Sequence, residues 1–199
     1  MCKVDLHIMI FAFTDEEVAD ALTTAARQNP SMQIRILADW NQRTEARGQQ
    51  VNRLAKSGLS NLHVRYKADQ PYMWDSAVAN VRWNYHVSRG LLHHKTAIVL
   101  VDGHPRKLVC GSFNWTGTAT RSYEHVLLAD AREPDCKELI VRVALEFEAI
   151  WSDGRASLSP IDAEQHYLSI VAAFRRNPTI SPSAIRGLED AQGEPLHVV

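Results

Sequence analysis

The sequence has few of the features that mark special classes of protein. Its 199 residues contain three cysteines, Cys2, Cys110 and Cys136, whose odd number and lack of CxxC spacing argue against a disulfide framework and a cysteine zinc site. No apolar run approaches the roughly 18 residues that a membrane span needs, and the first residues are not typical of a signal peptide. We therefore expect a cytoplasmic protein without stable membrane association.

An excess of charge of either sign is also missing. The 22 Lys and Arg residues nearly balance 23 Asp and Glu residues, for a net charge of −1. This total gives little support for a nucleic-acid partner, since such proteins usually carry an excess of basic residues. A local basic set nevertheless lies in the second quarter of the chain: Arg43, Arg47, Arg53, Lys56, Arg65 and Lys67. It is either a solvated helix face or a track for a polyanion, and we favour the polyanion.

The most informative segment is a predicted β-hairpin at residues 93–114. An apolar, β-rich run at 91–101 is followed by a turn signal at residues 102–105 and a second strand at 108–110. Side chains alternate along a strand, so His93 and Lys95 point the same way, about 7 Å apart. Ser112 and Asn114 repeat that spacing on the other arm. Imidazole, ammonium, hydroxyl and carboxamide groups should therefore converge, and this combination suits a phosphate group.

The alternative interpretation is structural. A lone His-x-Lys pair on a strand is usually a solvated face, but packing gives no reason for Gly-Ser-x-Asn polar groups beside so apolar a strand. The adjacent His93 and His94 also raise the question of a metal. Because neighbouring strand residues point to opposite faces, these two histidines cannot easily share an ion. We expect no metal site and no cofactor.

These residues resemble the HKD motif of the phospholipase D superfamily. His93, Lys95, Gly111, Ser112 and Asn114 match the motif, but six residues separate Lys95 from Asp102 where the family has four. The role of Asp102 is therefore left open. Residues 122–126 resemble the family segment whose glutamate orients the catalytic histidine, and this likeness makes Glu124 the candidate partner of His93.

The resemblance implies an α/β fold, a phospholipase D-like α-β-α sandwich with a mixed central sheet and helices on both faces. The hydrophobic pattern agrees over residues 4–151, and we take residues 1–151 as the catalytic domain. It predicts strands at 4–13, 34–39 and 62–66, a helix opened by a capping box at 14–17, and a helix at 43–56 that Gly58 ends. A further helix is predicted at 134–151.

The remaining segments are less informative. Residues 152–199 are predicted to form a C-terminal extension, with a helix at 161–176 and a loose tail after residue 178. This extension could dock on the domain or extend a subunit contact. An aromatic segment at 72–88, with Trp74, Trp83 and Tyr85, either lines the substrate cleft or packs in the core.

The chain has one His-x-Lys pair, and in the resembled family single-motif members form a two-fold dimer with the site at the interface. The resemblance thus implies a homodimer in which His93 attacks phosphorus and the partner subunit's His93 protonates the leaving oxygen. Lys95 and Asn114 would hold the phosphate oxygens, Ser112 would add a hydrogen bond, and Glu124 would fix the tautomer of His93.

The substrate is open between three possibilities. We favour an endonuclease that hydrolyses DNA or RNA without a metal. The alternatives are a phospholipase D-type lipid phosphodiesterase and a nucleic-acid-binding protein with a relict site. The sequence shows no strongly amphipathic basic helix of the kind that binds membrane surfaces, and the intact His93, Lys95, Ser112 and Asn114 argue against a relict.

Overall fold

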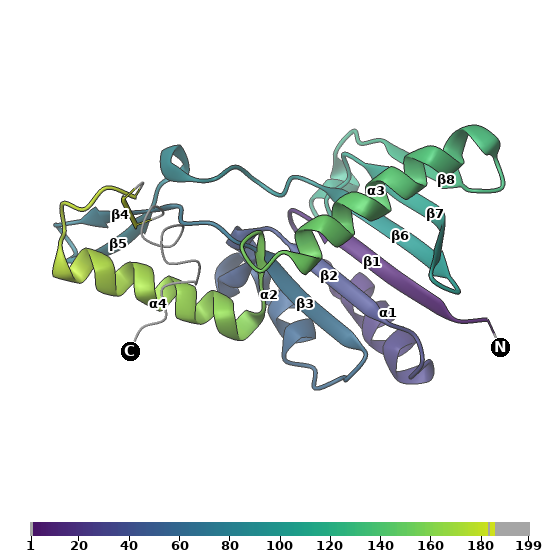
Figure 1. The fold of residues 1–199 in the computed structure, drawn as a ribbon, viewed down its shortest axis with the longest axis horizontal. Helices are drawn as coiled ribbons and strands as arrows, with labels where there is room; N and C mark the ends of the chain where they lie inside the picture. The colour runs from purple at the N-terminus through teal and green to yellow at the C-terminus, as the bar shows by residue number, and fades with distance from the viewer. Residues whose placement is uncertain (1, 183, 186–199) are drawn as a thin grey trace.

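A mixed seven-stranded sheet forms the centre of the protein (Figure 1). The computed structural model describes residues 2–182, 184 and 185. The strands are β1 (Val4–Ile10), β2 (Ile34–Ala38), β3 (Leu62–Lys67), β6 (Lys95–Val101), β7 (His104–Gly111), β8 (Val126–Asp130) and β9 (Ser157–Leu158). They lie in the order β8-β7-β6-β1-β2-β3-β9, with β1, β2 and β3 parallel and the other pairs antiparallel. The predicted mixed sheet is confirmed.

Helices cover both faces of this sheet, as predicted. Along β1, Ile8 and Ile10 join a core cluster with residues of α1 (Glu16–Gln28), α2 (Glu45–Ala55) and α4 (Pro160–Arg176). Met9 points to the opposite face and joins a second cluster with residues of α3 (Pro134–Ser152). Figure 1 shows α3 crossing the face opposite to α1 and α2. The period-two alternation of β1 thus separates two cores.

Two predicted helix starts were wrong in detail. The N-cap of α1 is Asp15, whose carboxylate accepts from the Val18 amide at 3.0 Å, whereas the Thr14 amide donates to the Trp115 carbonyl. The helix predicted at 43–56 is α2, which begins at Glu45, and a 3-10 turn, η1 (Trp40–Arg43), precedes it. The break occurs because Thr44 takes extended backbone angles between the two. Gly58 follows the end of α2, as expected.

The C-terminal extension docks on the sheet. Strand β9 pairs with the end of β3 through Tyr66 and Leu158, and Phe174 of α4 is buried in the first core. The chain that was predicted to be loose after residue 178 still contacts this core through Ile180 and the buried Ile185. The rest of the predicted tail, residues 186–199, lies outside the described residues.

The aromatic segment forms a separate β-hairpin, β4 (Tyr72–Asp75) and β5 (Asn80–Trp83), followed by η2 (Tyr85–Val87). In Figure 1 this hairpin lies beside α4, at the end of the molecule away from β8. Trp74 and Trp83 pack partly against the first core, whereas Tyr85 is 52% exposed. Packing in the core is therefore confirmed for Trp74 and Trp83, and a role of the segment in lining the substrate cleft stays a prediction.

Most of the predicted basic track is used within the fold. Arg43 pairs with Glu164 of α4 at 2.6 Å, and Arg53 pairs with Asp20 of α1 at 2.7 Å. Arg65 donates to Ser157, Lys67 donates to the Gly90 carbonyl, and Arg47 donates to the Tyr85 hydroxyl. These contacts join separate elements, so the set contributes to the architecture, and its role as a track for a polyanion stays a prediction.

One buried histidine makes stability depend on pH. His7 is 4% exposed and stacks on Phe147 at a ring distance of 4.3 Å. Burial, and then the charge of Arg35, lowers the pKa of His7 from 6.5 to about 4. Because unfolding lets this ring take up a proton, its contribution is complete above pH 6.5 and is lost as the pH falls toward 4. We expect the loss to be about 2 to 3 kcal/mol.

Urea unfolding at pH 7 and at pH 4.5 measures this effect, with His7→Gln as the comparison. The wild-type protein should lose more free energy of unfolding between the two pH values than the variant does. Equal losses would show that other groups account for the acid sensitivity.

Candidate active site

The β6–β7 hairpin carries the predicted site residues at its open end. Asp102 and Gly103 form its tight turn, with Asp102 in the left-handed region at φ 50°. Asp-Gly is a preferred sequence for such turns because both positions tolerate positive φ. The turn is shorter than predicted, because Pro105 already lies in β7, opposite Leu100 and next to a register shift. Proline is tolerated in a strand at such an irregularity.

Lys95 begins β6 and lies against the ring of His93. Its ammonium nitrogen is 3.1 Å from each ring nitrogen of His93 and donates to the His93 carbonyl oxygen at 2.9 Å. Phe11, which follows β1, completes the contact, with its ring 4.6 Å from that of His93 and 5.0 Å from the Lys95 nitrogen. Lys95 is buried, at 6% exposed, whereas the side chain of His93 is accessible.

This environment favours neutral His93. Partial burial of the ring, and then the positive charge of Lys95, lowers the pKa of His93, while Asp39 opposes the shift. Burial also lowers the pKa of Lys95, and Glu124 opposes that change. At neutral pH the imidazole is therefore largely unprotonated, with a free electron pair that can attack an electrophile.

Ser112 and Glu124 meet at the other arm of the site. The Ser112 hydroxyl donates to a carboxylate oxygen of Glu124 and accepts from the His125 amide at 3.1 Å. Gly111 lets these strands approach, because a Cβ atom there would lie 2.1 Å from the His125 carbonyl oxygen. Among the described residues, the contact found for Glu124 is with Ser112 and not with His93. Its role in orienting His93 stays a prediction.

Asn114 lies in a loop that is attached to the end of β1. The neighbouring Trp115 amide donates to the Ala12 carbonyl, and the Trp115 ring packs edge-on against Phe13 at 5.3 Å. The Oδ1 atom of Asn114 is buried and has no hydrogen-bond partner among the described residues. A buried polar atom without a partner is costly and is commonly satisfied by a ligand. The loop is therefore fixed while its amide remains available.

His94 points away from this group. Its Nε2 atom lies 3.2 Å from a carboxylate oxygen of Glu146 on α3, on the face opposite to the Lys95 contact. This separation agrees with the expectation that His93 and His94 cannot share an ion. Within residues 2–182, 184 and 185, no group of three or more His, Cys, Asp or Glu side chains is arranged to hold a metal ion.

Most of the chain matches a known protein family. The family model described as "Cardiolipin synthase, PLD-like domain" matches residues 1–151. The chain belongs to the phospholipase D-like family. Its motif residues and its mixed sheet agree with that membership, and the predicted division at residue 151 stays a prediction.

One curated protein is similar to this chain in sequence, and two solved structures are similar to it in fold. It is 32% identical over 150 residues to a mitochondrial cardiolipin hydrolase of Danio rerio, which covers 75% of this chain but only 52% of that protein. The chain thus spans about half the length of that curated relative. NucT from Helicobacter pylori has a TM-score of 0.56 and 20% identity, with coverage of 79% of this chain and 82% of NucT. The phospholipase D family member Nuc from Salmonella typhimurium gives 0.53 and 20%, with coverage of 78% and 80%.

Asp102, the remaining motif position of this phospholipase D-like chain, lies at the opposite end of β6 from His93. Its carboxylate accepts from the Lys3 amide at 2.9 Å and from the Cys2 thiol at 3.2 Å. The Lys3 amide, and then the Cys2 thiol, lowers the pKa of Asp102. The structure thus places Asp102 outside the site group, where it fastens the start of β1 to the hairpin turn.

Sequence reasoning missed two neighbours of the motif. Phe11 contacts both His93 and Lys95, and Asp39 accepts from the backbone amide of Leu92 at 2.7 Å. A signal for Asp39 existed, because it is an acidic residue directly after a buried parallel strand. Phe11 gave no such signal, because an aromatic residue after a strand is usually only part of the core.

Proposed function

We propose that this protein is a metal-independent phosphodiesterase that works through a covalent phosphohistidine. The observation that carries the proposal is the pairing of an accessible His93 with a Lys95 ammonium 3.1 Å from its ring nitrogens. A phosphodiester is anionic, so an adjacent cation both attracts it and stabilises the charge that develops on its oxygens. Membership of the phospholipase D-like family supports this chemistry.

The proposed reaction has two displacements. A ring nitrogen of the neutral His93 attacks phosphorus, the bond from phosphorus to the leaving oxygen breaks, and the partner subunit's His93, which enters the step as the protonated imidazolium, gives that oxygen its proton. Water then attacks the phosphohistidine, the same partner imidazole removes its proton, and the bond between nitrogen and phosphorus breaks to restore His93. Lys95 and the amide of Asn114 would hold the non-bridging oxygens throughout, with Ser112 as a further donor.

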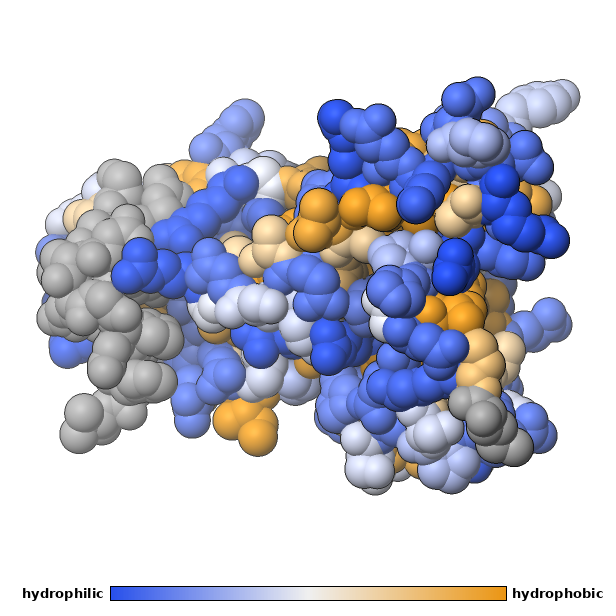
Figure 2. Space-filling model, turned by 45° about the vertical axis from the view of Figure 1, so that its right-hand side comes forward, coloured by the Kyte–Doolittle hydropathy of each residue, from blue (hydrophilic) through white to orange (hydrophobic). Residues whose placement is uncertain are grey.

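We propose a homodimer because one chain supplies one such histidine. A surface suited to a second copy lies next to Glu124, on strand β8 at the edge of the sheet. Val126, Leu127 and Leu128 are 54%, 49% and 74% exposed there. Figure 2 shows that hydrophobic residues gather in patches on the half of the molecule that carries the sheet, with hydrophilic residues around them. Large exposed apolar groups of this kind are typical of protein contacts.

As substrate we propose DNA or RNA. Supporting this choice, an exposed arginine of α2 lies beside two aromatic rings, one at the end of β5 and one in η2. The Arg47 guanidinium is 5.9 Å from the centre of the Trp83 ring and donates to the Tyr85 hydroxyl at 2.9 Å. Such a group can stack on nucleobases while it attracts the backbone. No helix within the described residues is long and apolar enough to cross a membrane.

A second candidate is hydrolysis of a phospholipid. The likeness to a mitochondrial cardiolipin hydrolase favours it. The arrangement at His93 would serve either substrate, because both contain a phosphodiester. A nucleic-acid-binding protein with a relict site is the third possibility, and the intact geometry at His93 and Lys95 argues against it.

The substrate is tested with plasmid DNA, single-stranded RNA and cardiolipin vesicles, each in excess EDTA. We expect cleavage of a nucleic acid to persist in EDTA. Arg47→Ala and Tyr85→Ala should each weaken binding of single-stranded DNA by about 10-fold, since stacking contributes about 1 to 3 kcal/mol per base. Both variants should hydrolyse a small activated phosphodiester at the wild-type rate.

The outcomes separate the candidates. Turnover of cardiolipin alone would replace the first candidate by the second. Binding of nucleic acid without cleavage of any substrate would favour the relict site. Activity that disappears in EDTA and returns with a divalent metal would contradict the metal-independent reaction.

A further inference from the structure

We infer that Asp39 and Asp69 are positioning residues, which hold the chain segment 88–92 in place and thereby set the position of His93. The inference rests on the proposed function only in taking His93 as the reacting group. Segment 88–92 is the end of the long excursion between β3 and β6, and it has no strand partners of its own. It therefore needs other contacts to bring His93 to one defined place.

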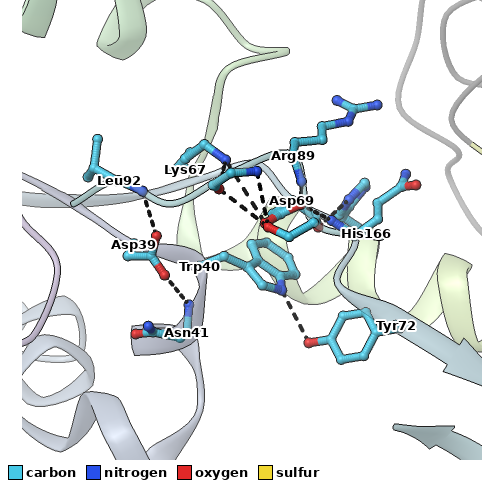
Figure 3. Close-up of polar contacts among 12 residues, drawn as sticks. Asp39, Trp40, Asn41, Lys67, Asp69, Tyr72, Arg89, Leu92 and His166 are labelled. Carbon is cyan, nitrogen blue, oxygen red and sulfur yellow. Dashed lines mark hydrogen bonds and ion pairs between the residues drawn. The ribbon is translucent and has the colours of Figure 1, made fainter. Parts of the chain in front are cut away.

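Asp39 fixes the end of this segment nearest to His93. Its Oδ2 atom accepts from the Leu92 amide at 2.7 Å, and its Oδ1 atom accepts from the Asn41 amide at 3.0 Å (Figure 3). One carboxylate thus joins the end of β2 to the residue before His93. Asp39 is only 2% exposed, and Leu92 itself is buried in the second core.

Asp69 fixes the beginning of the segment. Its Oδ1 atom accepts from the Arg89 amide at 2.7 Å, and its Oδ2 atom accepts from the Ser88 hydroxyl. Lys67, at the end of β3, adds a hydrogen bond of 2.6 Å to the Gly90 carbonyl. Figure 3 shows Asp69 and Asp39 directed at the same length of chain from two different places.

Burial makes these aspartates informative. Asp69 is 3% exposed, so both carboxylates are removed from water at a cost that apolar side chains would avoid. The cost is offset by the backbone amides that each carboxylate binds, and a carboxylate offers two oxygens with about four acceptor sites where an amide or hydroxyl side chain offers one oxygen with two. Both acids bind backbone amides of segment 88–92, and neither is paired only with a basic side chain. Their burial therefore indicates that the position of this segment is important for the site.

Helix α4 supports the Asp69 end from behind. The buried His166 ring lies 3.2 Å from the Asp69 carbonyl oxygen and packs edge-on against Trp40 at 5.5 Å. Trp40 directly follows Asp39 in the chain and donates to the Tyr72 hydroxyl at 3.1 Å. The C-terminal extension thereby contacts both ends of the arrangement, although it lies beyond the part of the chain that matches the family model.

Asp39 also differs from Asp69 in its electrostatic effect. The charged and titratable groups that act on His93 are Lys95 and His94, which lower its pKa, and Asp39, which raises it. Asp39 in turn is influenced by Lys67 and Asp69, and burial raises its own pKa. Removal of the Asp39 charge should therefore lower the pKa of His93, while removal of the Asp69 charge should not change it directly.

The test compares Asp39→Asn, Asp69→Asn and the control Asp20→Asn, which removes an exposed carboxylate that pairs with Arg53. The probe is a small activated phosphodiester, bis(p-nitrophenyl) phosphate. Both buried-site variants should lose about 10-fold to 100-fold in kcat, since misplacement by about 1 Å has that effect, while KM changes by less than about 2-fold. The pH profile of Asp39→Asn should move to lower pH, and that of Asp69→Asn should stay in place.

Two readouts are independent of catalysis. Hydrogen exchange of the Leu92 amide should accelerate in Asp39→Asn, and that of the Arg89 amide should accelerate in Asp69→Asn. NMR titration of the His93 ring should give a lower pKa in Asp39→Asn than in wild type. Folded variants with wild-type kcat and unchanged exchange would overturn the inference. Normal kcat in a His93→Asn variant would instead overturn the proposed function. The hydrogen exchange of the Leu92 and Arg89 amides would then be the test of whether the two aspartates hold the segment.

Discussion

His93→Asn should lower the rate of phosphodiester cleavage by about 10³-fold or more, because loss of a nucleophile typically has effects of that size. The adjacent His94→Asn should retain activity within about 3-fold of wild type. The contrast follows from the two environments. His93 lies against Lys95 and Phe11, whereas His94 is paired with Glu146 on the other face. Matched substitutions at consecutive positions separate chemistry from any general effect on β6.

Steady-state hydrolysis of bis(p-nitrophenyl) phosphate measures this difference, and thermal unfolding checks that both variants are folded. Mixing wild-type and His93→Asn subunits extends the test to the dimer. If each site needs both His93 side chains, an equal mixture with randomly exchanged subunits should have about one quarter of the activity of the same total amount of wild-type protein, because only dimers with two intact subunits are active. A value of one half would mean that each subunit acts alone.

Gly48→Ala should destabilise the protein by about 3 kcal/mol, at the upper end of the range for overpacking. A Cβ atom at this position would lie 1.5 Å from the Gln42 carbonyl oxygen, so the main chain of η1 and α2 must separate. Gly48 already departs from helical geometry, with φ −114° and ψ 30°. The side chain of Gln42 also accepts from the Phe13 amide, which links this contact to the chain after β1.

Thermal unfolding of Gly48→Ala should show a melting temperature lower by about 6 to 12 °C, given about 2 to 4 °C per kcal/mol for a chain of this size. Gly154→Ala is the matched control, because a Cβ atom there would meet no atom within 4 Å. Similar melting temperatures for the two variants would mean that η1 and α2 move apart without cost.

The sequence predicted the parts of the site that are local in the chain. His93, Lys95, Ser112 and Asn114 lie on one hairpin, so strand alternation and a turn signal were enough to bring them to one end. The mixed sheet and the helices on both of its faces came from the resemblance, and the structure confirmed them, whereas the order of the strands was not predicted. Helix starts were less predictable, since the side chains of Asp15 and Thr14 can both cap, and only the structure shows that the Asp15 carboxylate accepts from the Val18 amide.

Contacts across long stretches of sequence could not be predicted. Asp39 and Leu92 are 53 positions apart, and His166 and Asp69 are 97 apart. No local pattern links such residues, because the link exists only after β2, β3 and α4 have packed. Glu124 illustrates a related limit, since the partner of an exposed carboxylate depends on whether a second chain is present.

The late position of α4 in the chain has a consequence for synthesis on the ribosome. Its buried residues Ile170 and Phe174 close the same core that β1, β2 and β3 begin to form more than 100 residues earlier. Until α4 leaves the ribosome, Asp69 lacks the His166 ring that lies behind it. A nascent chain therefore carries the His93 motif before that motif is firmly held, and the proposed cleavage activity should develop only after α4 has docked.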